Sequence, residues 1–341
     1  MSKKQLGKFY TTNYEYILQN MKIPADISHI IEPFAGNCDL LNFIDTDKYI
    51  VEAYDIDSDY KNIIKRDTLK NPPCYDDKFV LTNPPYLARN KNKNKELYDK
   101  YNCNDLYKCF IINLINSKKC QGGIIIIPLN FISSNRKSDI NLRKRFFKEY
   151  IVDIINLFEE KVFDDTSYTV CSMLFNRRGS QIKKTKLYIY PTQKCVDVSF
   201  SEENNYTIGG EIYNLPVSEK YKIERATKFT TDDEYITNIL LKCIDDSTLN
   251  QLGFRIINSK DRYIDNTEKL SARSYATLVV KPMLSLQEQE KLVQEANSYL
   301  KKKREKYNSL FLSNYRESNG IARKRISFRL AFQICSYILS R

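Results

Sequence analysis

The tetrapeptide Asn83-Pro84-Pro85-Tyr86 combines residue types that are suited to hold a planar amine or amide. It follows the apolar run 79–82, which reads as a buried strand, and the prolines end that strand because they cannot donate to a sheet. The Asn83 amide oxygen and the carbonyl groups of the prolines are acceptors, and the Tyr86 ring offers a flat face. None of these groups is a strong nucleophile or a metal ligand, so a cofactor would have to supply the reactive group.

Three further features follow short apolar runs upstream of the tetrapeptide. Residues 29–41, HIIEPFAGNCDLL, read as a strand, a tight turn at Gly36 and a helix start, which lets a backbone approach a nucleotide-like ligand. Asp55 ends the next run, at the spacing of about 20 residues expected for a ribose-binding carboxylate, and Asp67 follows a third apolar pair. Because parallel strands end at one edge of a sheet, we expect these residues and Asn83 to form one site.

The elements that must position this site alternate between apolar strand-like runs and polar or amphipathic connectors, which is typical of βαβ units. We predict an α/β fold with a mostly parallel, Rossmann-like sheet and helices on both faces. The predicted strands are residues 30–32, 49–54, 79–82, 123–128, 151–157 and 168–175, with a helix at 105–117. The polar segment 89–102 reads as a solvated loop, with a mobile lid or a nucleic-acid contact as alternatives.

The alternation of strands and connectors is lost after the polar basic stretch NRRGSQIKKTK, residues 176–186. We therefore predict a catalytic domain at residues 1–180 and a second, mixed α+β domain at residues 181–341. In the second domain we expect helices at residues 232–244 and 326–339. A third helix is expected to start at the capping box of Ser285 and Glu288 and to run to about Lys306.

The charge of the chain points to a polyanionic partner. The sequence holds 54 Lys and Arg against 42 Asp and Glu, a formal net charge of +12, and such an excess favours nucleic acid. Residues 301–341 contain 11 basic and 2 acidic side chains. The basic run ARKRISFR near the end of the chain is therefore a candidate for phosphate contacts.

Other compositional features exclude several kinds of chemistry. The nine cysteines include no CxxC pair or His-bearing cluster with metal-ligand spacing, so we expect free thiols in a reducing cytoplasm and no metal site. His29 is the only histidine, which nearly excludes serine-type triads and histidine acid–base catalysis. No apolar run approaches the length of a membrane span, and we expect a cytoplasmic protein.

The order and spacing of these motifs in residues 5–180 resemble those of N6-adenine DNA methyltransferases that use S-adenosyl-L-methionine. The resemblance is to the class in which cofactor motifs precede the catalytic motif and a target-recognition domain comes last. It implies a catalytic set of Asn83, Pro84, Pro85 and Tyr86, with Phe163 beside the target base. It implies cofactor contacts from Tyr10, Thr11, Glu32, Pro33, Phe34, Ala35, Gly36, Asp39, Asp55, Ile56, Asp67, Thr68, Asn83 and Phe110. Two residues depart from the family pattern: Cys38 replaces a frequent glycine and Thr12 a frequent proline.

The resemblance implies methyl transfer to N6 of an adenine flipped out of a short double-stranded DNA site. Asn83 Oδ1 and the Pro84 carbonyl would accept from N6, Tyr86 would stack on the base, and Phe163 would pack beside it. We expect residues 181–341 to recognise the DNA, with phosphate contacts from Arg323, Lys324 and Arg325. We further expect a monomer, and the resemblance is compatible with a cognate restriction endonuclease or with a solitary role.

Three alternatives remain open at this point. A glutamine methyltransferase that modifies release factors would hold a side-chain amide with the same tetrapeptide, although that family resembles a shorter chain with a helical N-terminal domain. An RNA adenine methyltransferase would use the same pocket chemistry. A third alternative, from another class of protein, is a DNA-binding specificity module without turnover.

Overall fold

The structure is a computed structural model that describes residues 11–57, 60–163, 168–179, 184–245, 251–318 and 321–341. Its contacts divide the chain into two compact units. Unit 1 comprises Met1–Phe200 and Glu317–Ala322, and unit 2 comprises Ser201–Arg316 and Arg323–Arg341. The boundary between functional domains after residue 180 stays a prediction from the sequence.

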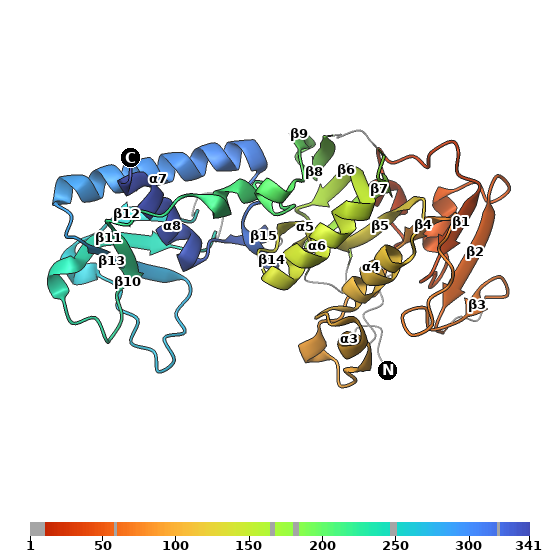
Figure 1. Cartoon of the computed structure of the whole chain (residues 1–341), viewed down its shortest axis with the longest axis horizontal. Coiled ribbons are helices and arrows are strands. Elements are labelled where there is room, and N and C mark those ends of the chain that lie inside the picture. The colour runs from red at the N-terminus through yellow and green to blue at the C-terminus, as the bar shows by residue number, and fades with distance from the viewer. Residues whose placement is uncertain (1–10, 58–59, 164–167, 180–183, 246–250, 319–320) are drawn as a thin grey trace. The chain divides into compact units, whose positions relative to one another are not determined.

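Unit 1 is built on one large sheet, and within the described residues its strand order is β3-β2-β1-β4-β5-β7-β6-β8-β9 (Figure 1). Neighbouring strands are parallel from β3 to β5, whereas β7 is antiparallel to both of its neighbours and β9 is antiparallel to β8. The bounds are β1 His29–Glu32, β2 Ile50–Asp55, β3 Ile64–Lys65, β4 Phe79–Thr82, β5 Gly122–Pro128, β6 Tyr150–Phe158, β7 Val170–Arg177, β8 Thr185–Tyr190 and β9 Lys194–Val198. The predicted α/β class with a mostly parallel sheet is thus confirmed.

The central strands of this sheet are buried on both faces. Every residue of β4, FVLT, and of β5, GGIIIIP, is buried, as expected for parallel strands that are covered by helices on both sides. The helices of unit 1 are α2 Tyr14–Ile17, α3 Glu96–Tyr101, α4 Leu106–Asn116, α5 Asn130–Ser133 and α6 Lys137–Glu149. Figure 1 shows α4 and α6 lying together over one face.

The opposite face of the sheet is covered near α2. Phe175 of β7 packs against Phe146 of α6, with 5.3 Å between the ring centroids. Ser172 lies three residues earlier on the same strand and so points to the other face. There its Oγ donates to the carbonyl oxygen of Ile17 at 2.6 Å, and Asn156 Nδ2 donates to the same oxygen at 3.2 Å. The residues around α2 are therefore fixed against the sheet.

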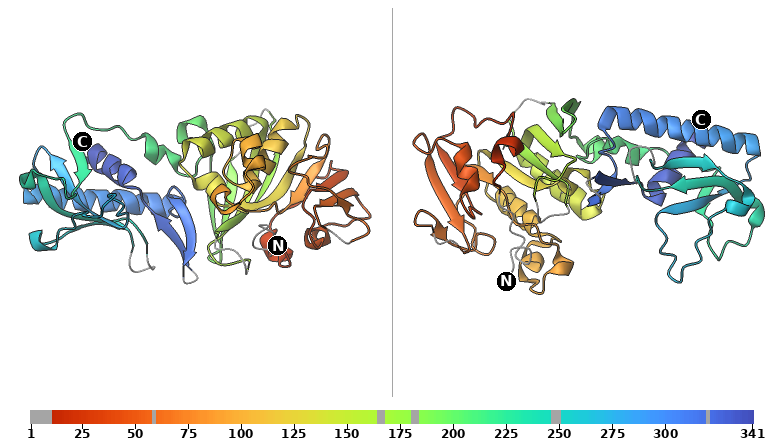
Figure 2. Two further views of the ribbon diagram at one scale, coloured as in Figure 1. Left: turned by 90° about the horizontal axis from the view of Figure 1, so that it is seen from below. Right: turned by 180° about the vertical axis from the view of Figure 1, so that it is seen from behind.

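Unit 2 is an α+β domain with a four-stranded antiparallel sheet in the order β10-β13-β11-β12 within the described residues (Figure 2). Its elements are β10 Lys222–Arg225, β11 Ile236–Lys242, β12 Gly253–Ile256, β13 Tyr275–Lys281, α7 Leu286–Tyr307 and α8 Phe328–Leu339. Strands β14 Ser313–Ser318 and β15 Ile321–Arg325 belong partly to each unit. Side chains of α7 and α8, among them Leu292, Leu300 and Ile334, share one apolar core with Leu241 and Leu278 of the sheet. The predicted mixed character of the C-terminal part is confirmed.

One predicted helix of unit 2 is wrong. Residues 232–244 form a short 3-10 turn, Asp233–Tyr235, followed by strand β11. Six of the seven β11 residues are buried because both faces of the strand are covered. The sequence predicts a helix here because Ile236, Ile239, Leu240 and Cys243 recur at the spacing of one helix face. The capping box of α7 is present as predicted: Glu288 N donates to Ser285 Oγ at 3.3 Å, and Ser285 N donates to Glu288 Oε2 at 2.7 Å.

Within the described residues, no helix is long and apolar enough to cross a membrane.

Candidate active site

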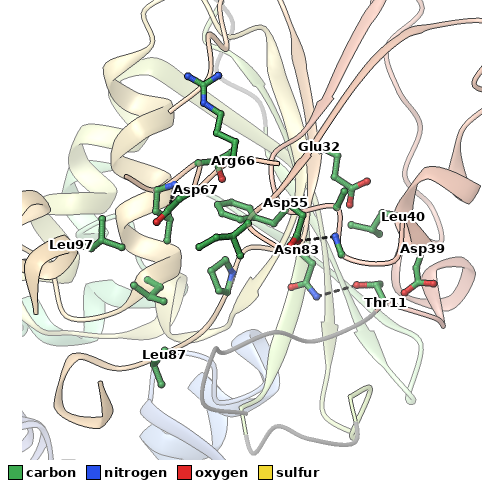
Figure 3. A pocket seen from close by; sticks show the side chains of 18 of the residues that line it. Thr11, Glu32, Asp39, Leu40, Asp55, Arg66, Asp67, Asn83, Leu87 and Leu97 are labelled. Atoms are coloured by element: carbon green, nitrogen blue, oxygen red, sulfur yellow. Dashed lines mark hydrogen bonds between the residues drawn. The ribbon is translucent and has the colours of Figure 1, made fainter. Parts of the chain in front are cut away.

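A cavity of about 330 Å³ lies at the carboxyl ends of β1 to β4 (Figure 3). Glu32 ends β1, Asp55 ends β2, Asp67 follows β3 and Asn83 follows β4, and all four line this cavity. The expectation that these strand ends meet at one edge is met because the four strands are parallel neighbours in the sheet. Figure 3 shows Glu32 and Asp39 toward one end and Arg66 and Asp67 toward the other.

The structure separates the predicted site residues into two groups. Twelve of them line the cavity: Thr11, Glu32, Phe34, Ala35, Gly36, Asp39, Asp55, Ile56, Asp67, Thr68, Asn83 and Pro85. Five others do not: Pro33, Pro84, Tyr86, Phe110 and Phe163. Tyr10 lies outside the described residues.

The turn after β1 is held by Asp55. Gly36 N donates to Asp55 Oδ2 at 3.0 Å, and Asp57 N donates to Asp55 Oδ1 at 2.8 Å. Gly36 has φ +53° and Cys38 has φ +65°, both in the left-handed region that glycine adopts most easily. A glycine in place of Cys38 would adopt this backbone conformation with less strain. The carboxylate of Asp55 fixes the loop that approaches a ligand in the cavity.

Glu32 gives one end of the cavity an unusual electrostatic character. Its side chain is 1% exposed, and Oε2 has no hydrogen-bond partner in the described part of the chain. Burial, and secondarily the negative charges of Asp39 and Asp55, raise the pKa of Glu32 well above its usual range. Burial also raises the pKa of Asp39, although a backbone hydrogen bond from Thr11 opposes this. A ligand with a cationic group would relieve the repulsion between these carboxyl groups.

Apolar residues also line the cavity. Ile56 is 48% exposed although it is a large hydrophobic residue, and it lines the cavity directly after Asp55. Phe34 also lines the cavity, and the ring of Phe110 packs edge-on against it with a centroid distance of 5.3 Å. Phe110 therefore supports the wall and does not form it. Thr68 Oγ1 donates to the Pro33 carbonyl at 2.8 Å, which gives Pro33 a similar supporting position.

Asn83 is buried and held from both sides. Its Nδ2 donates to Thr11 Oγ1 at 3.0 Å, and its Oδ1 accepts from the Tyr86 hydroxyl. That hydroxyl also lies 2.6 Å from the carbonyl oxygen of Ile126, and its single hydrogen can serve one of the two acceptors at a time. The Asn83 amide is thus oriented before any ligand binds.

The Tyr86 ring is 2% exposed and meets Tyr107 and Tyr168 edge-on, with centroid distances of 6.3 and 6.5 Å. Burial raises the pKa of Tyr86 well above its usual range. Phe163 is buried as well. A planar ligand can therefore reach the face of Tyr86 only if neighbouring side chains move.

Eight residues that line the cavity were not predicted from the sequence. They are Leu40, Arg66, Leu69, Leu87, Asn92, Asn94, Leu97 and Leu106. Several belong to the segment 89–102, which was interpreted as a solvated loop. Buried Tyr98 anchors this segment, since its hydroxyl donates to the Leu87 carbonyl at 2.9 Å. Tyr101 donates to the Leu69 carbonyl at 2.7 Å. The two tyrosines were the only sequence signal that this polar segment is folded.

Asp105 joins the catalytic loop to α4. Its Oδ1 accepts from Leu87 N at 3.1 Å, and Leu106 N donates to the Leu87 carbonyl at 3.3 Å. Burial raises the pKa of Asp105 to about 6, although Lys108 and backbone donors oppose this. The carboxyl group thus lies immediately behind two residues of the cavity wall, Leu87 and Leu106.

We predict that Asp105 makes the free energy of unfolding depend on pH. Its pKa is higher in the folded chain than in the unfolded chain, so the folded state binds more protons between pH 4 and 6, and its stability falls as pH rises through this range. A difference of about two pKa units corresponds to about 3 kcal/mol at most. Urea unfolding of wild-type protein and Asp105→Asn at pH 5 and pH 7 checks this. The variant should lose that part of the pH dependence, and identical pH profiles would contradict the prediction.

Part of the chain that contains this site is similar to a known protein family. Residues 49–215 match the family model for N-6 DNA methylases. The chain carries an N-6 DNA methylase domain. The matched segment includes β2 with Asp55, the tetrapeptide from Asn83 to Tyr86, and the other strands of the large sheet except β1, which precedes it. This match gives S-adenosyl-L-methionine as the cofactor of the methylase domain.

Solved structures similar to the methylase chain include a class I S-adenosylmethionine-dependent methyltransferase from Listeria monocytogenes (16% identity, TM-score 0.36, 51% of this chain and 61% of that one). A type I restriction enzyme modification subunit from Vibrio vulnificus YJ016 matches with 15% identity and a TM-score of 0.41, over 78% and 62% of the two chains. A type I methyltransferase subunit from Streptococcus thermophilus matches with 12% identity and a TM-score of 0.38, over 53% and 47%. The chain thus spans less than two thirds of the length of these proteins. Comparison with curated protein sequences finds no significant match.

Proposed function

We propose that the protein transfers the methyl group of S-adenosyl-L-methionine to N6 of an adenine in a short double-stranded DNA site. The observation that carries this proposal is the position of Asn83. It follows β4 inside an N-6 DNA methylase domain, and its amide lines a cavity that also contains a nucleotide-type turn and a ribose-type carboxylate.

The residues around the cavity fit the cofactor. Glu32 and Asp39 would face its cationic methionine part, because Glu32 is buried and its Oε2 has no partner among the residues that the structure describes. Asp55 at the end of β2 would bind the ribose hydroxyls, and Ile56 would pack against the adenine ring. Asp67 and Thr68 would lie near the adenine amine. The bound cofactor supplies an electrophilic methyl group, and the protein orients the acceptor nitrogen toward it.

The acceptor amine would be held by Asn83 Oδ1 and the Pro84 carbonyl. An amide oxygen has two lone pairs, so Oδ1 can accept from N6 while it keeps its hydrogen bond from Tyr86. Two acceptors on one amine favour a tetrahedral nitrogen whose lone pair points away from the ring and is available for attack. The methyl group leaves the cofactor sulfur for N6, and the proton that N6 loses is released to solvent.

Stacking of the base on Tyr86, with Phe163 beside it, is part of the same proposal. An adenine must leave the double helix to reach Asn83, which costs a few kcal/mol of stacking and pairing. The buried Tyr86 ring and the buried Phe163 require that base entry displace the side chains that now cover them.

Unit 2 is proposed to recognise the DNA, with its basic residues on the phosphates. Arg323 is exposed, whereas Lys324 Nζ donates to the carbonyl of Asn308 at the end of α7, at 3.1 Å. Successive side chains of β15 point to opposite faces, so Arg323 and Arg325 share a face and Lys324 lies on the other. The two arginines are therefore better placed than the lysine for phosphate contacts.

A monomer in the cytoplasm is proposed as the working form, and a cognate restriction endonuclease is its proposed functional partner. A solitary role would need no change in the site.

Binding to DNA should weaken steeply with salt, since each neutralised phosphate contributes about −0.9 to the slope of log K against log salt. For several phosphate contacts, we expect affinity to fall by about 10³-fold between 50 and 200 mM salt. Fluorescence anisotropy with a labelled duplex measures this slope. A flat response would contradict a duplex substrate.

The test of the function is a transfer assay with labelled cofactor and three acceptors: unmethylated duplex DNA, RNA and a bacterial release factor. Label in DNA supports the proposal. Label in RNA or in the release factor would show that Asn83 holds a different planar amine or amide. Tight DNA binding with no transfer to any acceptor would favour a specificity module without turnover.

A further inference from the structure

Unit 2 contains a hollow of about 330 Å³ whose lining includes three arginines, Arg225, Arg273 and Arg325, together with Ser327 and Phe328 at the start of α8. The arginines come from different segments: β10, the residues before β13, and the end of β15. Arg273 was not identified from the sequence, because it is isolated from other basic residues in the chain.

Arg225 stabilises one side of this hollow through an ion pair and hydrogen bonds to the main chain. Its Nη1 lies 2.9 Å from Asp265 Oδ2, and that carboxylate is almost completely buried. The same guanidinium donates to the carbonyl groups of Ala272 at 2.8 Å and Leu270 at 2.6 Å. Arg225 therefore holds the loop that carries Arg273, and Asp265 neutralises its charge.

Arg273 and Arg325 differ from Arg225 in their surroundings. The described part of the chain gives neither of them an acidic partner within salt-bridge distance. Arg325 Nη2 donates to the main-chain carbonyl of Arg273, which brings the two residues together. Burial, and the positive charge of Arg273, lower the pKa of Arg325, while Cys243 opposes this. Two like charges are thus held beside one hollow, and an anion between them would relieve their repulsion.

The start of α8 adds a third favourable element. The helix has twelve residues, and its Ser327 cap accepts from Leu330 N at 3.2 Å. The remaining amides of the first turn have no partner within a helix, and this end of the helix dipole is positive. Guanidinium groups and helix-start amides together match the oxygens of a phosphate group.

We propose that the hollow formed by Arg273, Arg325 and the first turn of α8 binds a phosphate group of the DNA backbone. This inference rests on the proposed function for its ligand. It adds Arg273 and the first turn of α8 to the phosphate contacts that were proposed for residues 323–325.

The first experiment measures duplex binding by fluorescence anisotropy over a range of salt for wild-type protein, Arg273→Gln and Arg325→Gln. We expect Arg273→Gln to weaken binding about 3- to 10-fold, equally for all duplex sequences, and to reduce the salt slope by about one. Arg273→Lys should keep most of the slope because it keeps the charge. Arg255→Gln is the matched control, since Arg255 is exposed on β12 and does not line the hollow. An unchanged slope in Arg273→Gln overturns the proposal.

A second measurement separates this inference from the proposed function. At constant ionic strength, inorganic phosphate in place of chloride should raise the Tm of wild-type protein and Arg255→Gln but not that of Arg273→Gln. If wild-type protein binds no DNA, the proposed function fails, and this Tm difference still supports a phosphate site, whereas its absence overturns one. Arg273→Gln could also lose the effect of phosphate on Tm and still bind DNA like wild-type protein. That result would show that the phosphate in this hollow does not come from the DNA backbone and would overturn the proposal.

Discussion

Replacement of Asn83 by alanine is expected to lower kcat for DNA methylation about 10³-fold, the size of effect found when a hydrogen-bonding group to the transition state is removed. The amide oxygen is the proposed acceptor for the N6 amine, and alanine removes it. Cofactor affinity should change little, because the proposed cofactor contacts at Glu32, Asp55 and Ile56 are untouched. Single-turnover methylation and calorimetric titration with S-adenosyl-L-methionine measure the two effects separately.

The matched control is Thr11→Val, which removes the acceptor of Asn83 Nδ2 but leaves Asn83 Oδ1 in place. Loss of one hydrogen bond that only orients the amide is worth about 1 kcal/mol, or up to about tenfold in rate. A Thr11→Val enzyme as inactive as Asn83→Ala would show that position, and not the oxygen, limits the reaction. Full activity of Asn83→Ala would remove Asn83 from the chemistry.

Replacement of Asp55 by alanine is expected to weaken cofactor binding about 100-fold, roughly 3 kcal/mol, since a buried charged hydrogen-bond group with several partners is lost. Asp55 holds the amides of Gly36 and Asp57, and its carboxylate is the proposed ribose ligand. The variant loses both the shape of the turn and the ribose contact. Calorimetric titration with the cofactor and with S-adenosylhomocysteine measures the change.

Asp57→Ala is the control for this variant, because Asp57 is exposed and does not line the cavity. It should bind the cofactor like wild-type protein. Asp55→Asn keeps an acceptor oxygen but loses the charge, and its affinity should fall between those of the wild type and Asp55→Ala. Wild-type affinity in Asp55→Ala would place the cofactor elsewhere.

The edge of the sheet that carries the site could be predicted from the sequence. Glu32, Asp55, Asp67 and Asn83 each follow a short apolar run, and parallel strands bring such positions to one edge. This part succeeds because strand ends depend on local pattern: prolines and turn residues stop a strand wherever it lies in the fold.

Two features depended on tertiary contacts that the local pattern does not encode. The sequence of β11 predicts a helix because Ile236, Ile239 and Cys243 recur at helical spacing, and pairing with the neighbouring strands β12 and β13 makes it a strand. Asn92, Asn94 and Leu97 form a cavity wall only because Tyr98 and Tyr101 fix their segment to distant carbonyl groups. The proximity of Arg273 and Arg325 could not be predicted from the sequence either, because the two arginines are far apart in the chain and meet only in the folded unit.

The most direct test of the central claim identifies the atom that receives the methyl group. Wild-type protein and Asn83→Ala are incubated with labelled S-adenosyl-L-methionine and unmethylated duplex DNA, the DNA is digested to nucleosides, and the labelled nucleoside is identified. We expect label in N6-methyladenine nucleoside with wild-type protein and almost none with Asn83→Ala. Label in another nucleoside, or equal label with both proteins, would contradict it.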